Sequence, residues 1–128
     1  MLSLSHLLLI GIGGSLGAVA RVLVANALAV WLGPHFPFGT FFVNVSGSFA
    51  IGALLAFLTP RGSDAVELRA FLVVGFLGAY TTYSTFTYET LALFQAGRLV
   101  AALVNLAGQL VLGLAAVVLG VVAVRSLT

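Results

Sequence analysis

The chain alternates between long apolar stretches and short polar breaks. Its longest uncharged runs lie at positions 1–20, 22–60, 70–88 and 99–124. A helix that crosses a membrane needs about 20 mostly apolar residues. The run 22–60 contains Gly-Pro-His-Phe-Pro at 33–37, which ends a helix. The pattern therefore predicts four membrane-spanning helices, at about 4–32, 38–59, 66–95 and 99–124.

Short connections join these predicted spans, which favours antiparallel neighbours in a four-helix, up-and-down arrangement. Asp64 and Glu67 resemble a capping box that opens the third span. Gly97 follows Ala96 as the left-handed cap residue at the end of that span. The N-terminus has no positive region of the kind found in cleavable signals. We therefore expect residues 1–128 to form a single all-α integral-membrane domain.

Composition supports the membrane interpretation and excludes several classes of protein. Hydrophobic residues make up 62% of the chain and charged residues 6%, whereas a soluble domain carries about 25% charged residues. A soluble globular protein, a disordered tail and a nucleic-acid-binding domain are excluded. The absence of Cys excludes disulfides, thiolate metal sites and a Cys nucleophile. No carboxylate pair, His cluster or nucleophile–base set indicates an enzyme.

The arginines give only a weak signal of orientation, because three lie on one predicted side and one on the other. Arg61, Arg69 and Arg125 share the side of the N-terminus, and Arg98 lies opposite. Loop Lys and Arg residues normally set topology. This bias is compatible with insertion in both orientations and equally with a single orientation.

Small residues form stripes on the first and fourth spans. Gly13 and Gly17 are four residues apart in the first span, as are Gly14 and Ala18, while the fourth span carries Gly113, Ala116 and Gly120. Small residues let helix backbones approach closely in lipid. The stripes serve packing either within one subunit or between subunits.

Polar residues at membrane depth are unfavourable, so their placement is informative. Thr40, Asn44 and Ser48 recur every four residues and share one face of the second span. Asn105 and Gln109 have the same spacing in the fourth span. These side chains either hydrogen-bond between helices or line a polar pathway.

The third span is the most unusual, because positions 81–88 read Thr-Thr-Tyr-Ser-Thr-Phe-Thr-Tyr. Gly75 and Gly78 precede this run and weaken a helix. We predict that the helix is interrupted between Gly78 and Thr82; the alternative is a continuous helix whose hydroxyls bond back to the preceding turn. An interruption frees backbone carbonyls, which are hard oxygen ligands suited to Na⁺.

Neutral donors and aromatic edges favour a pathway for a small anion. Tyr83 and Phe86 share a face and present positive ring edges, although packing is the usual role of such a pair. The candidate donors are the amides and hydroxyls of Asn44, Thr82, Ser84, Asn105 and Gln109. Such groups replace hydration while still letting the ion leave.

Three motifs carry a resemblance to a known family. They are Gly13-Gly14-Ser15-Leu16-Gly17-Ala18-Val19-Ala20-Arg21, Gly39-Thr40-Phe41-Phe42-Val43-Asn44-Val45-Ser46-Gly47 and Gly75-Phe76-Leu77-Gly78-Ala79-Tyr80-Thr81-Thr82-Tyr83-Ser84-Thr85-Phe86. The chain resembles the Fluc (CrcB) family of fluoride channels over all four spans. The resemblance implies a passive channel that exports fluoride across a bacterial or archaeal inner membrane. It also implies an antiparallel, dual-topology homodimer with two pores and a structural Na⁺ at the dimer centre.

The resemblance also implies roles for individual residues. The backbone carbonyls of Gly78 and Thr81 would hold the Na⁺, and Arg21 would be a vestibule cation. The expected fluoride pore comprises Thr40, Asn44, Tyr83, Ser84, Thr85, Phe86, Glu89, Asn105 and Gln109. Tyr83 stands where the family usually has Phe, and Asn105, Gln109 and Gly113 stand where relatives often have Ser or Tyr.

Two other functions fit a small membrane protein. A small multidrug exporter needs an acid in its first span to exchange protons for cationic drugs, but this span has none and carries Arg21. A structural membrane subunit would explain the glycines but not the hydroxyls and aromatics of the third span. The expected partners are fluoride, a second copy of the chain and the lipid bilayer, with no nucleic acid.

Overall fold

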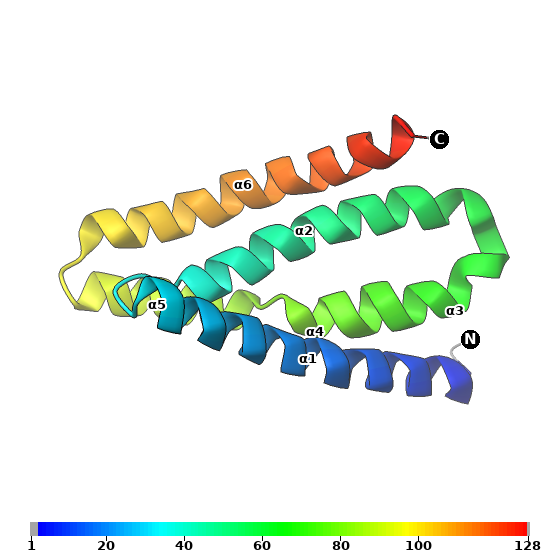
Figure 1. The fold of residues 1–128 in the computed structure, drawn as a ribbon, viewed down its shortest axis with the longest axis horizontal. Helices are drawn as coiled ribbons and strands as arrows, with labels where there is room; N and C mark the ends of the chain where they lie inside the picture. Colours follow the sequence, from blue (N-terminus) through cyan, green and yellow to red (C-terminus); the bar gives the residue numbers. More distant parts are fainter. Residues whose placement is uncertain (1–2, 128) are drawn as a thin grey trace.

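The computed structural model describes residues 3–127, and every regular element in this range is helical. The chain reverses direction after each long helical stretch, so that neighbouring stretches lie antiparallel (Figure 1). The turn at 33–37 and the turn after α5 lie at one end, and the η1 segment lies at the other with the two termini. The elements in order are α1 (Leu4–Leu32), α2 (Phe38–Leu58), η1 (Thr59–Ala65), α3 (Val66–Leu68), η2 (Arg69–Leu77), α4 (Gly78–Tyr80), α5 (Tyr83–Gln95) and α6 (Leu99–Arg125).

Three stretches of the described chain are long and apolar enough to cross a membrane: Leu4–Leu32, Phe38–Gln95 and Leu99–Arg125. The middle stretch is 58 residues long and folds back on itself at η1 (Figure 1). Large apolar side chains face outward along the helices; Val30 is 88% exposed and Trp31 83%. A water-soluble protein hides such groups, so this is a multi-pass membrane protein whose outer surface suits lipid.

Glycines bring the helix backbones together within one chain. A side chain on Gly13 or Gly17 of α1 would collide with the backbone carbonyls of Phe71 or Phe76 in η2. A side chain on Gly120 of α6 would collide in the same way with the carbonyl of Phe49 in α2. The sequence left open whether the stripes of small residues pack within one chain or between chains. These three glycines pack within one chain.

The ends of the helices differ in detail from the sequence predictions. The predicted capping box at Asp64 and Glu67 is wrong, because α3 begins after Ala65 with no side-chain cap. Asp64 lies instead inside the 3₁₀ segment η1, where Gly62 adopts a positive φ of 55° and turns the chain. Gly97 is left-handed as predicted, with φ 72°. Two predicted boundaries shift by one residue, since α2 ends at Leu58 and α6 at Arg125, while α5 ends at Gln95 as predicted.

The first half of the third predicted span is wound more loosely than an ordinary helix, which the sequence did not indicate. η2 is a π-helix of nine residues, Arg69–Leu77. Such segments are rare and occur mostly as single-turn bulges, often at functional sites. This one packs along the glycine face of α1 and is followed by the short α4, after which the helix is interrupted.

Candidate functional site

The helix is interrupted at two residues, within the predicted interval. α4 ends at Tyr80 and α5 begins at Tyr83. Between them Thr81 has φ −83° and ψ 159°, and Thr82 has φ −152° and ψ 117°, so both are extended. Thr82 then caps α5, since its hydroxyl oxygen accepts the N–H of Thr85 at 3.3 Å. A β-branched residue favours the extended conformation, and a Thr hydroxyl favours the cap.

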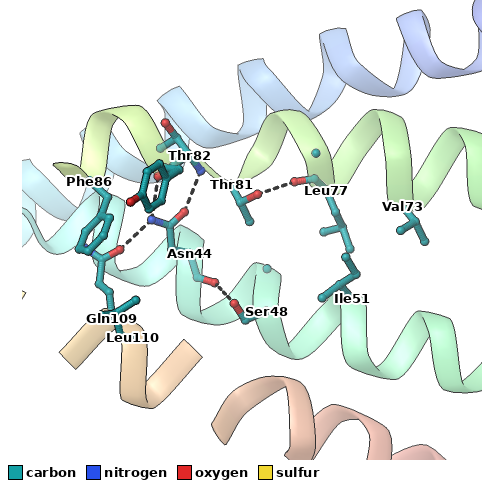
Figure 2. A pocket seen from close by; sticks show the side chains of 13 residues that line it. Asn44, Ser48, Ile51, Val73, Leu77, Thr81, Thr82, Phe86, Gln109 and Leu110 are labelled. Carbon is teal, nitrogen blue, oxygen red and sulfur yellow. Dashed lines mark hydrogen bonds between the residues drawn. The ribbon is translucent and has the colours of Figure 1, made fainter. Parts of the chain in front are cut away.

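The side chain of Asn44 bridges the interruption. The backbone N–H of Thr82 donates to Asn44 Oδ1 at 2.8 Å, and Asn44 Nδ2 donates to the carbonyl of Thr82 at 3.0 Å. Figure 2 shows Asn44 on α2 reaching both groups. The amide thus replaces the hydrogen bonds that Thr82 would have made in a continuous helix. This satisfies backbone groups that would otherwise be unpaired at membrane depth.

Asn44 is also linked to the polar residues of α6. Its Nδ2 donates to Gln109 Oε1 at 2.7 Å, and Gln109 Nε2 donates to Asn105 Oδ1 at 2.8 Å. Asn105 Nδ2 continues to the hydroxyl of Thr90 at 2.9 Å. The polar stripes of the second and fourth predicted spans therefore meet, and their side chains bond to one another.

A pocket of about 340 Å³ opens beside the interruption. Figure 2 shows the side chains that line it, which come from α2, α6 and both halves of the interrupted helix. Its polar lining consists of Asn44, Ser48, Thr81, Thr82 and Gln109, and Gly78, Tyr83 and Phe86 also border it. Three of the predicted donors, Asn44, Thr82 and Gln109, thus lie beside two aromatic rings around one pocket.

The two aromatic residues of the predicted pair differ in burial. Their ring centroids lie 5.9 Å apart, with the planes tilted by 56°. Phe86 is 4% exposed, whereas Tyr83 is 76% exposed. Phe86 is therefore packed inside the chain, while Tyr83 borders the pocket from an exposed face of the chain.

Glu89 and Thr40 belong to a second pocket, of about 450 Å³, near the turn at 33–37. The Thr40 hydroxyl donates to Glu89 Oε1 at 2.9 Å. Arg98 also borders this pocket, and its guanidinium donates to the carbonyl of His35. The structure thus divides the predicted pore residues between two pockets.

Four predicted residues line neither of these two pockets. Arg21 lies on α1, where its Nε is buried without a hydrogen-bond partner. Ser84 is exposed at the start of α5, and Thr85 is half-buried against Thr82. Asn105 is fully buried and acts through its hydrogen bonds.

Sequence reasoning overlooked Thr90. This residue is 6% exposed and completes the polar chain by donating to the carbonyl of Phe86 at 2.8 Å. Its spacing of four from Phe86 and eight from Thr82 places it on the same helical face, which is the signal that could have identified it.

Within residues 3–127, no group of three or more His, Cys, Asp or Glu side chains could hold a metal ion. The residues that border the first pocket offer oxygens of neutral groups. The non-helical backbone at Thr81 and the neighbouring Gly78 border the first pocket.

Comparison with known proteins shows the family to which the chain belongs. A sequence profile of the family described as "CrcB-like protein, Camphor Resistance (CrcB)" matches residues 8–121. The chain belongs to the CrcB family. The match includes all the residues that line the two pockets.

Several CrcB relatives carry the name "Fluoride-specific ion channel FluC". One from Methylococcus capsulatus is 53% identical over 118 residues, which cover 92% of this chain and 52% of the relative. The chain thus spans about half the length of that relative. One from Hydrogenovibrio crunogenus is 45% identical and covers 91% of this chain and 88% of the relative. One from Rhizobium meliloti is 40% identical over 124 residues, which cover 97% of this chain and 99% of the relative.

Proposed function

We propose that this chain forms a passive, fluoride-selective channel that lets F⁻ leave the cytoplasm. The observation that carries the proposal is the pocket at the helix interruption, where neutral amides, hydroxyls and an aromatic pair border about 340 Å³ inside a lipid-exposed helical protein. The name borne by relatives of similar length supports the same function.

The chemistry of the pocket favours a small anion over a cation. Amide and hydroxyl hydrogens and ring edges are positive, and no acidic side chain borders this first pocket. Neutral donors replace part of the hydration shell without holding the ion too tightly to leave. The membrane potential then drives the ion outward, with about 2.3 kcal/mol per charge per 100 mV.

A passive pore suffices for this purpose. Hydrogen fluoride crosses lipid as a neutral molecule and dissociates in a neutral cytoplasm, which traps the anion. A pore that conducts F⁻ but excludes larger anions relieves this accumulation without collapsing other gradients. We place the protein in a bacterial or archaeal inner membrane, where each chain makes four crossings.

The open face of α5 supports assembly with a second copy. Tyr83, Ser84 and Tyr88 are exposed on this helix, and a polar face at membrane depth needs protein or water beside it. An antiparallel partner would cover the face and repeat the pocket, which gives two pores per dimer. The weak arginine bias is compatible with insertion in both orientations.

We further propose that a structural Na⁺ lies at the centre of this dimer. Gly78 and the extended Thr81 provide carbonyl oxygens beside the first pocket, and two copies would together supply four. Hard oxygens without a cluster of carboxylates suit a monovalent cation. When bound, the ion would tie together the two interrupted helices by electrostatic attraction to these carbonyls.

The proposed path includes both pockets. Asn44, Tyr83, Phe86 and the α6 amides border or support the first, and Thr40 with Glu89 borders the second. Ser84 and Thr85 lie at the start of α5 between the aromatic residues, and Arg21 would raise the anion concentration in a vestibule.

The decisive experiment is anion efflux from liposomes that contain the purified protein. Fluoride and chloride electrodes record efflux after a K⁺ ionophore relieves the charge imbalance. We expect rapid fluoride efflux and chloride efflux no faster than in protein-free liposomes. Absence of fluoride efflux, or equal rates for both anions, would contradict the proposal.

A further inference from the structure

The hydrogen bonds around the start of α5 form a circuit that leaves this helix and returns to it. The outgoing half begins at the backbone N–H of Thr82, which donates to Asn44 Oδ1 at 2.8 Å. Asn44 Nδ2 then donates to Gln109 Oε1 at 2.7 Å. This half runs from the interruption through α2 to α6.

The returning half passes from Gln109 through Asn105 and Thr90, which are buried and border neither pocket. Gln109 Nε2 donates to Asn105 Oδ1 at 2.8 Å, and Asn105 Nδ2 donates to Thr90 Oγ1 at 2.9 Å. The Thr90 hydroxyl donates in turn to the carbonyl of Phe86 at 2.8 Å. The circuit thus spans the first turn of α5, which carries both aromatic residues.

The direction of these bonds is fixed by the two ends of the circuit. A carboxamide can present either its oxygen or its nitrogen to a neighbour. The backbone N–H of Thr82 can only donate, and the carbonyl of Phe86 can only accept. Each of the three amides therefore turns its oxygen toward the Thr82 end and its nitrogen toward the Phe86 end.

This direction determines which donors remain for an anion. Both hydrogens of Asn44 Nδ2 are used, on Thr82 and Gln109. The hydroxyls of Ser48, Thr81 and Thr82 donate to protein oxygens. Apart from the Tyr83 hydroxyl, the second hydrogen of Gln109 Nε2 is the polar side-chain donor left over among the described residues that line the first pocket.

We propose that Thr90 and Asn105 are positioning residues of the anion path. They do not border the pocket, yet they fix which end of Gln109 donates and hold the first turn of α5 in place. Without the Thr90 hydroxyl, Asn105 Nδ2 loses its partner in a fully buried site. Asn105 then keeps only its bond from Gln109 Nε2, so the acceptor that holds the Gln109 donor in position is no longer fixed. This inference rests on the proposed fluoride channel.

The test compares Thr90→Ser with Thr90→Ala, which differ from each other by one hydroxyl. Fluoride efflux from liposomes is measured for both variants. We expect Thr90→Ser to stay within about twofold of the unmodified protein, and Thr90→Ala to fall about tenfold, because a buried amide donor is left without a partner. Equal rates for the two variants would overturn the proposal.

Ser15→Ala is the matched control. The Ser15 hydroxyl donates to the carbonyl four residues earlier, Gly11, at 2.9 Å, as Thr90 does to Phe86. Ser15 is exposed and accepts no bond from another helix. We expect unchanged efflux for this variant. A loss equal to that of Thr90→Ala would show that the helical back-bond, rather than the circuit, is responsible, and would overturn the proposal.

A double-variant cycle separates a shared circuit from independent packing defects. If Thr90 and Asn105 act through one circuit, adding Thr90→Ala to Asn105→Ala lowers efflux no further than the more impaired single variant. Losses that multiply would overturn the proposal. Thr90→Val, which keeps the side-chain volume, replaces Thr90→Ala in both comparisons if the alanine variant does not fold.

These outcomes are distinct from failure of the proposed function. If the unmodified protein conducts no fluoride, the channel itself is wrong. If it conducts fluoride and the Thr90→Ser and Thr90→Ala variants have equal efflux rates, the proposed channel function is retained and the positioning role is rejected.

Discussion

Replacement of Asn44 by Ala removes the side chain that joins the interrupted helix to α2 and α6. Three hydrogen bonds disappear: those to the N–H of Thr82 at 2.8 Å, to the carbonyl of Thr82 at 3.0 Å and to Gln109 at 2.7 Å. The first two satisfy backbone groups that have no helical partner at the interruption.

The loss of stability should be modest. Hydrogen bonds between membrane helices average about 0.6 kcal/mol, so three of them amount to about 2 kcal/mol. The free energy of unfolding of a folded protein is about 5–15 kcal/mol. The Asn44→Ala protein should therefore still fold and assemble.

The loss of function should be much larger than the loss of stability. Without the bridge, Thr82 and the first turn of α5 are free to move, and the circuit that orients Gln109 loses its fixed end. We expect fluoride efflux from liposomes to fall to the rate of protein-free liposomes. Size-exclusion chromatography and thermal unfolding in detergent should place the variant close to the unmodified protein.

Gln95→Ala serves as the control, because it removes an exposed amide at the last residue of α5. It should leave both efflux and stability unchanged. Normal fluoride efflux by a folded Asn44→Ala protein would refute the reasoning and remove Asn44 from the path.

Three further predictions follow from the packing, the aromatic pair and the proposed cation. Gly13→Ala should lower the thermal unfolding temperature, since its Cβ would collide with the carbonyl of Phe71. Gly11→Ala, whose Cβ would meet nothing within 4 Å, should preserve or slightly raise that temperature. Equal unfolding temperatures would contradict the close approach of α1 to η2. Tyr83→Ile and Phe86→Ile should both slow fluoride efflux, and Phe86→Ile, at the buried ring, should also lower stability; normal conduction by both would leave the rings with a packing role alone. Replacement of Na⁺ by a large organic cation should reduce fluoride efflux, and unchanged efflux would argue against the central ion.

Local sequence signals predicted the helices and the interruption well. Apolar runs of membrane length, broken by the prolines and glycine of 33–37, determine where helices form because the hydrocarbon core imposes their length. The interruption at Thr81 and Thr82 was predictable because glycines precede a run of hydroxyl residues that favour caps over helix interiors. The capping box at Asp64 failed, since Gly62 turns the chain and Asp64 lies in η1 rather than at the start of α3.

The sequence did not predict which helices contact one another. Helical periodicity places Asn105 and Gln109 on one face of α6, but it does not say which helix that face meets. Packing of α2 against α6 through Gly120 brings Gln109 to Asn44. Thr90 escaped notice for the same reason, since a lone Thr with a back-bond to its own helix looks ordinary until Asn105 is found opposite it.

The sequence by itself thus determined that this is a membrane protein. It also determined the ends of the helices to within a residue or two, and the interruption of one helix among hydroxyl residues. These properties depend on neighbours along the chain. Only the tertiary structure decided that Thr40 and Glu89 occupy a different pocket from Asn44, that Gly13 and Gly17 of α1 pack against η2 of the same chain, and that three amides join in one directed circuit. Those properties depend on which faces come within hydrogen-bonding distance, and that is set by how closely the glycines allow the helices to approach.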